Sequence, residues 1–196
     1  MREHLSYCKS CDASLHDVDD LAVTMKSLAV EAPKSCCEGV RDSFDRVDDL
    51  WVAFGEHGLR MIGRGGSEDA FRASYAKKYG RPLERATLPA NLKKEIENAD
   101  AKHVDFSGMS DLEADVLKVL TRIPRGEVRT YGWVAQQAGH PKAVRAIGSV
   151  CARNAVPFVV PCHRVVPSTG GVGEYAFGRA MKRELLQREG VDVDAL

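Results

Sequence analysis

Residues 159–166 read VVPCHRVV, which sets a cysteine and a histidine between two apolar pairs. The apolar residues on both sides predict that Cys162 and His163 lie inside the fold and not on a mobile segment. A buried thiol is normally inert, because desolvation opposes formation of the thiolate. Cys162 would therefore need a base, and a neighbouring histidine oriented by a carboxylate is a common solution. For the dipeptide alone, the alternative that both side chains simply fill the core is the better interpretation.

The composition is that of a cytosolic protein with one large domain or two small ones. With 196 residues, of which 44% are hydrophobic, the chain can bury a substantial core. No apolar run reaches the roughly 18 to 20 residues that span a bilayer, and the N-terminus lacks the apolar segment of a signal peptide. We therefore expect a cytoplasmic protein without membrane contact, whose six cysteines serve metal binding, catalysis or burial more than disulfides.

The net charge is zero, but the charges are unevenly spread. Residues 1–105 carry 16 Lys and Arg against 19 Asp and Glu, and residues 106–196 carry 12 against 9. This positive bias is too small to establish nucleic-acid binding by itself. It does indicate that the C-terminal half is the part that would face phosphates.

The first 45 residues contain a candidate metal site. On a helix, His4, Cys8 and Cys11 would share one face. With a ligand from Cys36 or Cys37 they would make a closed zinc site of four ligands. A set of unliganded thiols near a frayed terminus explains the same pattern equally well.

The rest of the N-terminal half predicts a small domain, residues 1–105, made of a hairpin and helices. The expected elements are a helix within residues 18–30, strands over 49–54 and 59–62, a helix from its N-cap Ser67 to Gly80, and an exposed helix and linker over 91–103. Nothing in the hairpin or its helix predicts chemistry.

Residues 106–196 predict a second, mainly helical domain. The expected elements are a helix opened by the capping box of Ser110 and Glu113, an extended piece over 127–130, helices over 133–138 and 142–153, a buried strand over 156–160, a glycine-rich loop over 167–178 and a helix over 179–189. Met181, Leu185 and Leu186 are the expected inward face of the last helix. Glu189 ends that helix, where an acid opposes the helix dipole. Its position suggests a partner imidazole, with a solvated glutamate as the alternative.

The two helices over 133–138 and 142–153 form a candidate helix-turn-helix. We expect Val144, Ile147 and Val150 to face inward. The second helix begins with Lys142 and carries Arg145, as a nucleic-acid reader would. Many helical hairpins of this kind bind nothing. The small residues of this helix would let its backbone approach the minor groove, with Arg145 as the intruding side chain.

Taken together, these residues resemble the O6-alkylguanine-DNA alkyltransferase family, the methylated-DNA–protein-cysteine methyltransferases. The resemblance covers about residues 105–190 and rests on IPRGEVRTYG at 123–132, PKAVRAIG at 141–148, Asn154, and PCHRVV at 161–166. It implies an α/β (α+β) fold with a ribonuclease-H-like N-terminal domain and a winged-helix-like C-terminal domain, divided between residues 105 and 106.

The resemblance implies a DNA repair protein that reacts once. Cys162 would accept the alkyl group from O6 of a guanine flipped out of double-stranded DNA. His163 would act as the base through a water molecule, with its imidazole held by Glu189, and Tyr131 would turn the phosphate and protonate the departing guanine. The implied DNA contacts are Tyr131, Lys142, Ala143, Arg145 and Ala146, and the implied pocket residues are Trp133, Asn154, Val165, Tyr175 and Ala176. The transfer itself needs no cofactor, structural zinc is suggested only at the N-terminus, and we expect a monomer.

One loop departs from the family, and two other functions stay open. Residues 174–177 read EYAF, where the family usually has Asn-Tyr-Ser. Ala176 lacks the hydroxyl, Phe177 would narrow the pocket against bulky alkyl groups, and Glu174 adds negative charge near DNA. The first alternative is a non-catalytic protein that binds alkyl lesions, but such relatives lack the cysteine that this chain has at Cys162. The second is a DNA-binding regulator that responds to metal or alkylation through its N-terminal cysteines.

Overall fold

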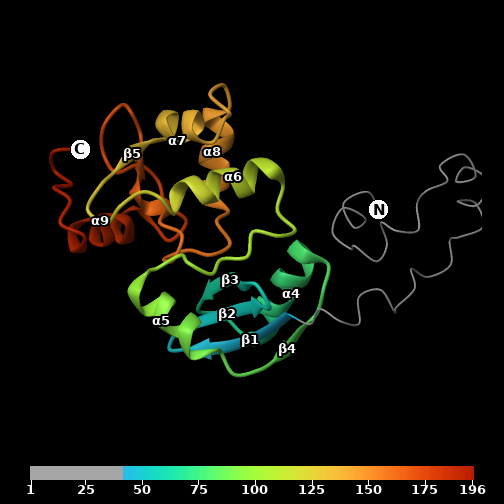
Figure 1. Cartoon of the computed structure of the whole chain (residues 1–196). Helices are drawn as coiled ribbons and strands as arrows, with labels where there is room; N and C mark the ends of the chain where they lie inside the picture. Colours follow the sequence, from blue (N-terminus) through green and yellow to red (C-terminus); the bar gives the residue numbers. More distant parts are fainter. Residues whose placement is uncertain (1–41) are drawn as a thin grey trace, which may run out of the picture. The chain divides into compact units, whose positions relative to one another are not determined.

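The described part of the chain combines a small β-sheet with several helices. The computed structural model describes residues 42–196, which have a mixed α/β architecture (Figure 1). The candidate metal ligands His4, Cys8, Cys11, Cys36 and Cys37 and the expected helix within 18–30 lie outside the described residues. The elements are β1 (Asp42–Val47), β2 (Leu50–Gly55), β3 (Gly58–Arg64), α4 (Glu68–Tyr79), β4 (Leu83–Arg85), α5 (Ala90–Asn98), α6 (Asp111–Leu120), β5 (Arg129–Thr130), α7 (Tyr131–Gln137), α8 (Val144–Ala152), the 3-10 turn η2 (Cys162–Arg164), β6 (Val165–Val166) and α9 (Arg179–Arg188).

The sheet has the order β3-β2-β1-β4, with β4 parallel to β1 and the other neighbours antiparallel. The predicted hairpin is confirmed as β2 and β3, whereas β1 and β4 were not foreseen. The hairpin turn requires Gly58, which has a φ of +124°. Leu59 N–H donates to the His103 carbonyl at 2.8 Å, which holds that carbonyl close to Gly58. A Cβ atom at residue 58 would therefore collide with it.

Helix α4 begins and ends where the sequence predicts. The Ser67 hydroxyl accepts from the N–H of Ala70 at 3.2 Å, and Gly80 closes the helix in the left-handed conformation. The spacing of Phe71, Tyr75 and Tyr79 by four residues predicts the inner face of this helix. Phe71 and Tyr75 are buried, and Tyr79 is half-buried. The exposed helix expected within 91–103 is present as α5, most of whose residues are exposed, although Leu92 and Glu95 are buried.

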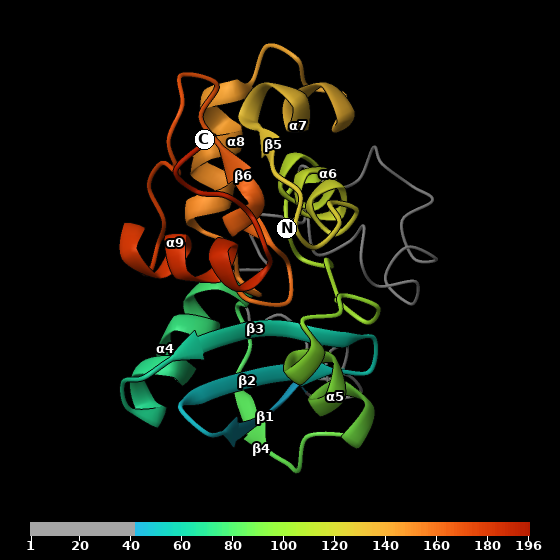
Figure 2. The same ribbon diagram turned by 90° about the vertical axis from the view of Figure 1, so that its left-hand side faces the viewer.

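Helices α6, α7 and α8 pack together in the second part of the structure (Figure 2). The pair α7 and α8 confirms the two predicted helices, but α8 begins at Val144 and not at Lys142. The expectation that Val144 faces inward is wrong. Because it is the first helical residue, it lies at the open end of α8 with 39% of its surface exposed, while Ile147 and Val150 are buried.

The buried strand expected over 156–160 is wrong as well. The segment is buried, but it is folded into turns by the side chain of Asn154. The Asn154 Oδ1 accepts from Val156 N–H at 3.0 Å, and its Nδ2–H donates to the Val160 carbonyl at 2.9 Å. Phe158 has a φ of +72°, which no strand residue adopts. The chain therefore reaches Cys162 through a tight turn and not along a sheet.

Two short parallel strands join the helical part to the Cys-His segment. In β5 and β6, Arg129 pairs with Val165 and Thr130 pairs with Val166. Tyr131 directly follows β5, and Cys162 lies three residues before β6. This pairing brings Tyr131 and Cys162 together from positions 31 residues apart.

One core crosses the expected domain boundary near Asp105. Buried residues of the hairpin, such as Val52 and Leu59, belong to the same apolar cluster as Leu117, Ile147 and Val160. Residues 42–196 form a single compact unit of the chain. The boundary itself stays a prediction. Within these residues, no helix has both the length and the apolar character needed to cross a bilayer.

Candidate active site

Cys162 is a buried thiol that accepts a hydrogen bond from a side chain. It opens η2 with only 4% of its surface exposed, and Asn154 Nδ2–H donates to its Sγ at 3.2 Å. Burial raises the pKa of the Cys162 thiol, while the Asn154 hydrogen bond and the charge of Lys182 act in the opposite direction. The thiol is therefore protonated at rest and needs a base in order to react.

His163 offers such a base. Its side chain is buried, and its Nε2 lies 2.9 Å from Glu189 Oε1. An Nε2–H that donates to this carboxylate fixes the tautomer, so the lone pair is on Nδ1. Among residues 42–196, Nδ1 of His163 has no hydrogen-bond partner. The imidazole is thus held at one nitrogen and open to a proton at the other.

Glu189 is held by a second residue that sequence reasoning missed. Arg164 Nε–H donates to Glu189 Oε2 at 2.9 Å and Nη2–H to Oε1 at 2.8 Å, while Nη1–H donates to the Ile123 carbonyl at 2.6 Å. Burial acts to raise the pKa of Glu189, but hydrogen bonds from His163 and Arg164 together lower it to about 2. The carboxylate therefore stays charged and keeps His163 oriented. Arg164 follows His163 directly in the motif PCHRVV, and this adjacency is the feature of the sequence from which its role could have been predicted.

Lys182 is the second residue that sequence reasoning missed. Its side chain is buried, and its Nζ donates to the Val165 carbonyl at 2.5 Å and to the Glu174 carbonyl at 3.5 Å. Burial lowers the pKa of Lys182 to about 8, against the opposing influence of Cys151 and Cys162. The inner face of α9 carries Lys182 and Leu186, whereas Met181 and Leu185 are only half-buried. Spacing by four residues could have assigned Lys182 to that face.

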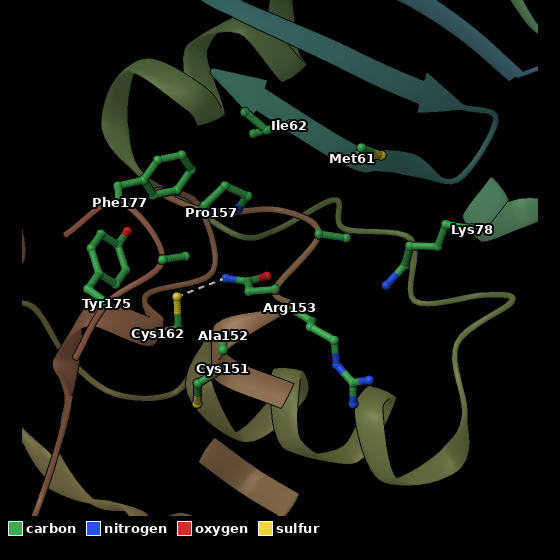
Figure 3. Close-up of a pocket in the computed structure, with 13 residues that line it drawn as sticks. Met61, Ile62, Lys78, Cys151, Ala152, Arg153, Pro157, Cys162, Tyr175 and Phe177 are labelled. Carbon is green, nitrogen blue, oxygen red and sulfur yellow. Dashed lines mark hydrogen bonds between the residues drawn. The ribbon is translucent and has the colours of Figure 1, made fainter. Parts of the chain in front are cut away.

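The Cys162 thiol borders a cavity of about 250 Å³ (Figure 3). Tyr175, Ala176 and Phe177 of the glycine-rich loop form one side of it, and Cys151 and Asn154 from the end of α8 form another. Strand β3 contributes Met61 and Ile62, and α4 contributes Lys78. The N-terminal half, to which the sequence assigned no pocket residue, thus lines the cavity.

The structure brings some predicted pocket residues together and leaves others out. Asn154, Tyr175 and Ala176 line the cavity, but Val165 and Trp133 do not. Val165 is buried, with its carbonyl bound to Lys182. The Trp133 ring is covered by the Arg129 guanidinium, 5.3 Å from its centroid.

Tyr131 is the first residue of α7 and is half-buried, but it is not among the residues that line the cavity. Burial, followed by electrostatic repulsion from Cys151 and Cys162, raises the pKa of its phenol to about 12. The hydroxyl therefore keeps its proton at neutral pH. Tyr131 thus keeps its phenolic proton within electrostatic reach of the Cys162 thiol.

The predicted DNA contacts surround the start of α8. Lys142 and Arg145 are exposed, and Ala143 and Ala146 are half-buried. Within residues 42–196, the Arg145 guanidinium has no ion pair or hydrogen bond, so it is free to move. Within the same residues, no group of three or more His, Cys, Asp or Glu side chains is placed to hold a metal ion.

Comparison with known proteins explains this arrangement. The family model described as "6-O-methylguanine DNA methyltransferase, DNA binding domain" matches residues 111–191. A methylated-DNA–protein-cysteine methyltransferase of Methanosarcina barkeri is 38% identical over 113 residues, which are 58% of this chain and 70% of that protein. The chain belongs to the methylated-DNA–protein-cysteine methyltransferase family.

Other members of the family are similar over shorter parts. The protein of Methanothermobacter thermautotrophicus is 40% identical over 48% of this chain and 53% of its own length, and the human protein is 44% identical over 45% and 42%. The chain thus spans about half the length of several curated relatives that it matches.

Solved structures of the family share the fold. The O6-methylguanine-DNA methyltransferase of Pyrococcus kodakaraensis covers 78% of this chain and 99% of its own, with 29% identity and a TM-score of 0.55. A Mycobacterium tuberculosis protein solved in complex with DNA covers 76% and 92%, with 26% identity and a TM-score of 0.57. These matches reach beyond residues 111–191 and therefore include part of the N-terminal half.

Proposed function

We propose that this protein repairs DNA by moving an alkyl group from O6 of guanine to the sulfur of Cys162. The observation that carries the proposal is a buried thiol that borders a cavity and lies next to a histidine oriented by a carboxylate. The cavity of about 250 Å³ lies just below the usual range of ligand pockets, roughly 300 to 1,000 Å³, which suits one base and not a large molecule. The family name supports the reaction.

The reaction balances without a cofactor. The bond between the alkyl carbon and O6 breaks, a bond from that carbon to Cys162 Sγ forms, and the thiol proton must reach the guanine. His163 Nδ1 takes the thiol proton through one water, and Tyr131 protonates the departing base. The phenol is protonated at neutral pH and so carries the proton to be donated, although burial raises its pKa to about 12 and makes it a weaker acid. The proton taken up by His163 then replaces the one that Tyr131 has lost, so the charges balance. The thioether product cannot be hydrolysed by these residues, so each molecule reacts once.

Access of DNA to the thiol requires base flipping. Because Cys162 is buried, a guanine inside a duplex cannot reach it. Arg153 is a cationic residue among those that line the cavity, where it can receive a phosphate beside a flipped nucleotide. Lys78 also lines the cavity, but its Nζ is paired with Glu113 Oε1 at 2.6 Å. We assign Arg145 to the gap in the base stack, with Lys142, Ala143 and Ala146 at the groove and Tyr131 at the phosphate.

The loop over residues 167–178 covers the base in this proposal. The ring centroids of Tyr175 and Phe177 are 5.6 Å apart, and the Phe177 ring stacks on that of Phe158 with the centroids 5.1 Å apart. The negative charge expected from Glu174 is offset by an ion pair with Arg179. A closed aromatic cluster of this kind favours small alkyl groups.

Other parts of the proposal rest on the family resemblance. We assign residues 1–105 to a ribonuclease-H-like N-terminal domain and residues 106–196 to a winged-helix-like domain. Specificity for O6-alkylguanine in double-stranded DNA, a monomeric state, a cytoplasmic location and structural zinc at His4, Cys8, Cys11, Cys36 and Cys37 stay predictions.

Mass spectrometry of the reacted protein tests the function. The full chain is incubated with a duplex oligonucleotide that contains one O6-methylguanine, and the tryptic peptide 154–164 is analysed. We expect one methyl group on Cys162 for each molecule of protein, and none on the Cys162→Ser variant. Tight binding of the lesion with Cys162 unmodified would instead identify a non-catalytic lesion-binding protein.

A further inference from the structure

The cavity beside Cys162 contains a second thiol that the proposed alkyl transfer does not use. Cys151 lies in the last turn of α8, is 8% exposed and forms no disulfide. It lines the same cavity as Cys162. In Figure 3 both cysteines lie on the side of the drawn residues away from β3, with the Cys151 sulfur further from β3 than the Cys162 sulfur.

Asn154 connects the two cysteines. Its N–H donates to the Cys151 carbonyl at 3.4 Å, and its Nδ2–H donates to Cys162 Sγ at 3.2 Å. The tight turn that Asn154 organises is therefore what returns the chain from one thiol to the other. The two thiols repel each other when ionised, which contributes to the raised pKa of Cys151, about 12, after the larger effect of burial.

Lys182 lies close enough to act on both thiols. Its charge favours the thiolate of Cys151 as well as that of Cys162. With a pKa of about 8, part of the Lys182 population is neutral in mildly alkaline solution and can accept a proton. Two cysteines thus line the cavity, and Lys182, which does not line it, is a base distinct from His163 whose charge acts on both.

We propose that Cys151 is a resolving cysteine, which forms a reversible disulfide with Cys162 when a hydroperoxide oxidises Cys162. In the first step, the Cys162 sulfur attacks the peroxide and becomes a sulfenic acid, and the peroxide leaves as an alcohol or water. In the second step, Cys151 loses its proton to Lys182 and its sulfur attacks the sulfenic sulfur. The S–S bond forms, and the hydroxyl leaves as water after it takes that proton.

The disulfide would protect the nucleophile. A sulfenic acid that is not captured is oxidised further to sulfinic and sulfonic acids, which thiol reductants do not reverse. A disulfide is reduced by thiols and returns Cys162 to use. This protective consequence rests on the proposed alkyl transfer, but formation of the bridge does not.

Peptide mapping of the oxidised full chain tests the bridge. Trypsin cleaves after Arg145, Arg153 and Arg164, so Cys151 and Cys162 fall in separate peptides, 146–153 and 154–164. After treatment with an equimolar amount of hydrogen peroxide and blocking of free thiols, we expect these two peptides to be joined. Cys162 recovered as sulfinic acid beside a free Cys151, or paired with Cys8, Cys11, Cys36 or Cys37, would overturn the proposal.

Variants separate this role from structural effects. In Cys151→Ser and Cys151→Val, Cys162 should proceed to sulfinic acid, and the alkyl acceptance lost to peroxide should not return with a thiol reductant. In the unaltered chain, most of the lost alkyl acceptance should return when a thiol reductant is added. Lys182→Met should slow the joining of the two peptides, while Lys118→Met, an exposed lysine of α6, should not.

The two proposals fail in different ways. Peptide mapping needs no DNA, so a chain that forms the bridge but never accepts a methyl group contradicts only the alkyl-transfer function. A chain that accepts the methyl group but gives no joined peptides contradicts only the role of Cys151. If either Cys151 variant does not fold, the mapping of the unaltered chain still decides.

Discussion

Glu189 illustrates how one carboxylate can serve stability and chemistry together. It accepts hydrogen bonds from His163 and two from Arg164, and only 10% of its side chain is exposed. The same contacts that orient the imidazole also satisfy a buried guanidinium. Removal of one partner from a buried pair leaves the other charge uncompensated.

Glu189→Gln should weaken the protein in a pH-dependent way. The pKa of Glu189 is about 2 in the fold against an ordinary value of 4.5, so its stabilisation is complete above about pH 4.5 and is lost as the pH falls toward 2. We expect Glu189→Gln to lower the free energy of unfolding at pH 7 by on the order of 3 kcal/mol. Urea unfolding between pH 7 and pH 3 measures this. The difference should shrink on acidification, and a difference independent of pH would contradict the ionised pair.

At the scale of elements, α8 presents its cationic start to solvent. Arg145 is exposed and unpaired within the described residues, as a side chain that enters DNA must be. Arg145→Ala should slow methyl transfer from duplex DNA at least about tenfold more than transfer from the free alkylated base, because flipping costs a few kcal/mol. Single-turnover rates on the two substrates measure the effect. Equal losses on both would contradict the role in base flipping.

Lys142→Ala is the matched control for Arg145. Lys142 is also exposed and lies in the turn just before α8. A cation that only contacts phosphate should weaken DNA binding and lower its salt dependence. It should leave the rate at saturating DNA close to that of the unaltered chain.

The glycine-rich loop controls the size of the cavity through Phe177. Its ring stacks on Phe158 and lines the cavity. Phe177→Ala should raise the rate with O6-benzylguanine relative to O6-methylguanine about tenfold or more, as expected when a pocket gains room for a bulky group. Both free bases are used, so that DNA binding does not contribute. Phe177→Leu should give an intermediate ratio, and an unchanged ratio in both variants would show that another residue limits the cavity.

Local signals in the sequence predicted most elements but not their pairing. Ser67, Gly80 and Ser110 mark helix ends because caps act within one turn. The strand expected over 156–160 failed because apolar runs do not distinguish a strand from buried turns, and the deciding features are the Asn154 side chain and the φ of Phe158. β1 and β4 were missed because their pairing depends on residues far along the chain.

The residues of the candidate site also divide into those that local signals predicted and those that they did not. Cys162, His163 and Asn154 come from one short motif, and Glu189 was suggested by its unfavourable place at a helix end. Lys182 was missed, since a lysine is normally exposed and only tertiary packing brings this one under the loop. Met61, Ile62 and Lys78 could not be found, because no local pattern indicates which distant strand or helix will border a cavity.

At the scale of the whole molecule, hydrogen bonds and ion pairs connect the hairpin with the helical part. Ile62 N–H in β3 donates to the Ala155 carbonyl at 2.7 Å, next to the turn that carries Cys162. Arg60 of β3 is buried and bonds Asp42, Asp105 and Ser107, which fixes the segment between the two halves. The position of the active-site turn therefore depends on the sheet.

This coupling predicts that the two halves unfold together. The chain has two tryptophans, Trp51 in β2 and Trp133 in α7, so each half has its own fluorescent probe. Variants Trp133→Phe and Trp51→Phe isolate the two signals, and we expect one urea midpoint for both. Leu59→Ala, which opens a cavity in the shared core, should lower the free energy of unfolding by about 2 to 5 kcal/mol at both probes. A shift at Trp51 that leaves the Trp133 transition in place would mean that the halves are energetically independent, and that the sheet does not support the active-site turn.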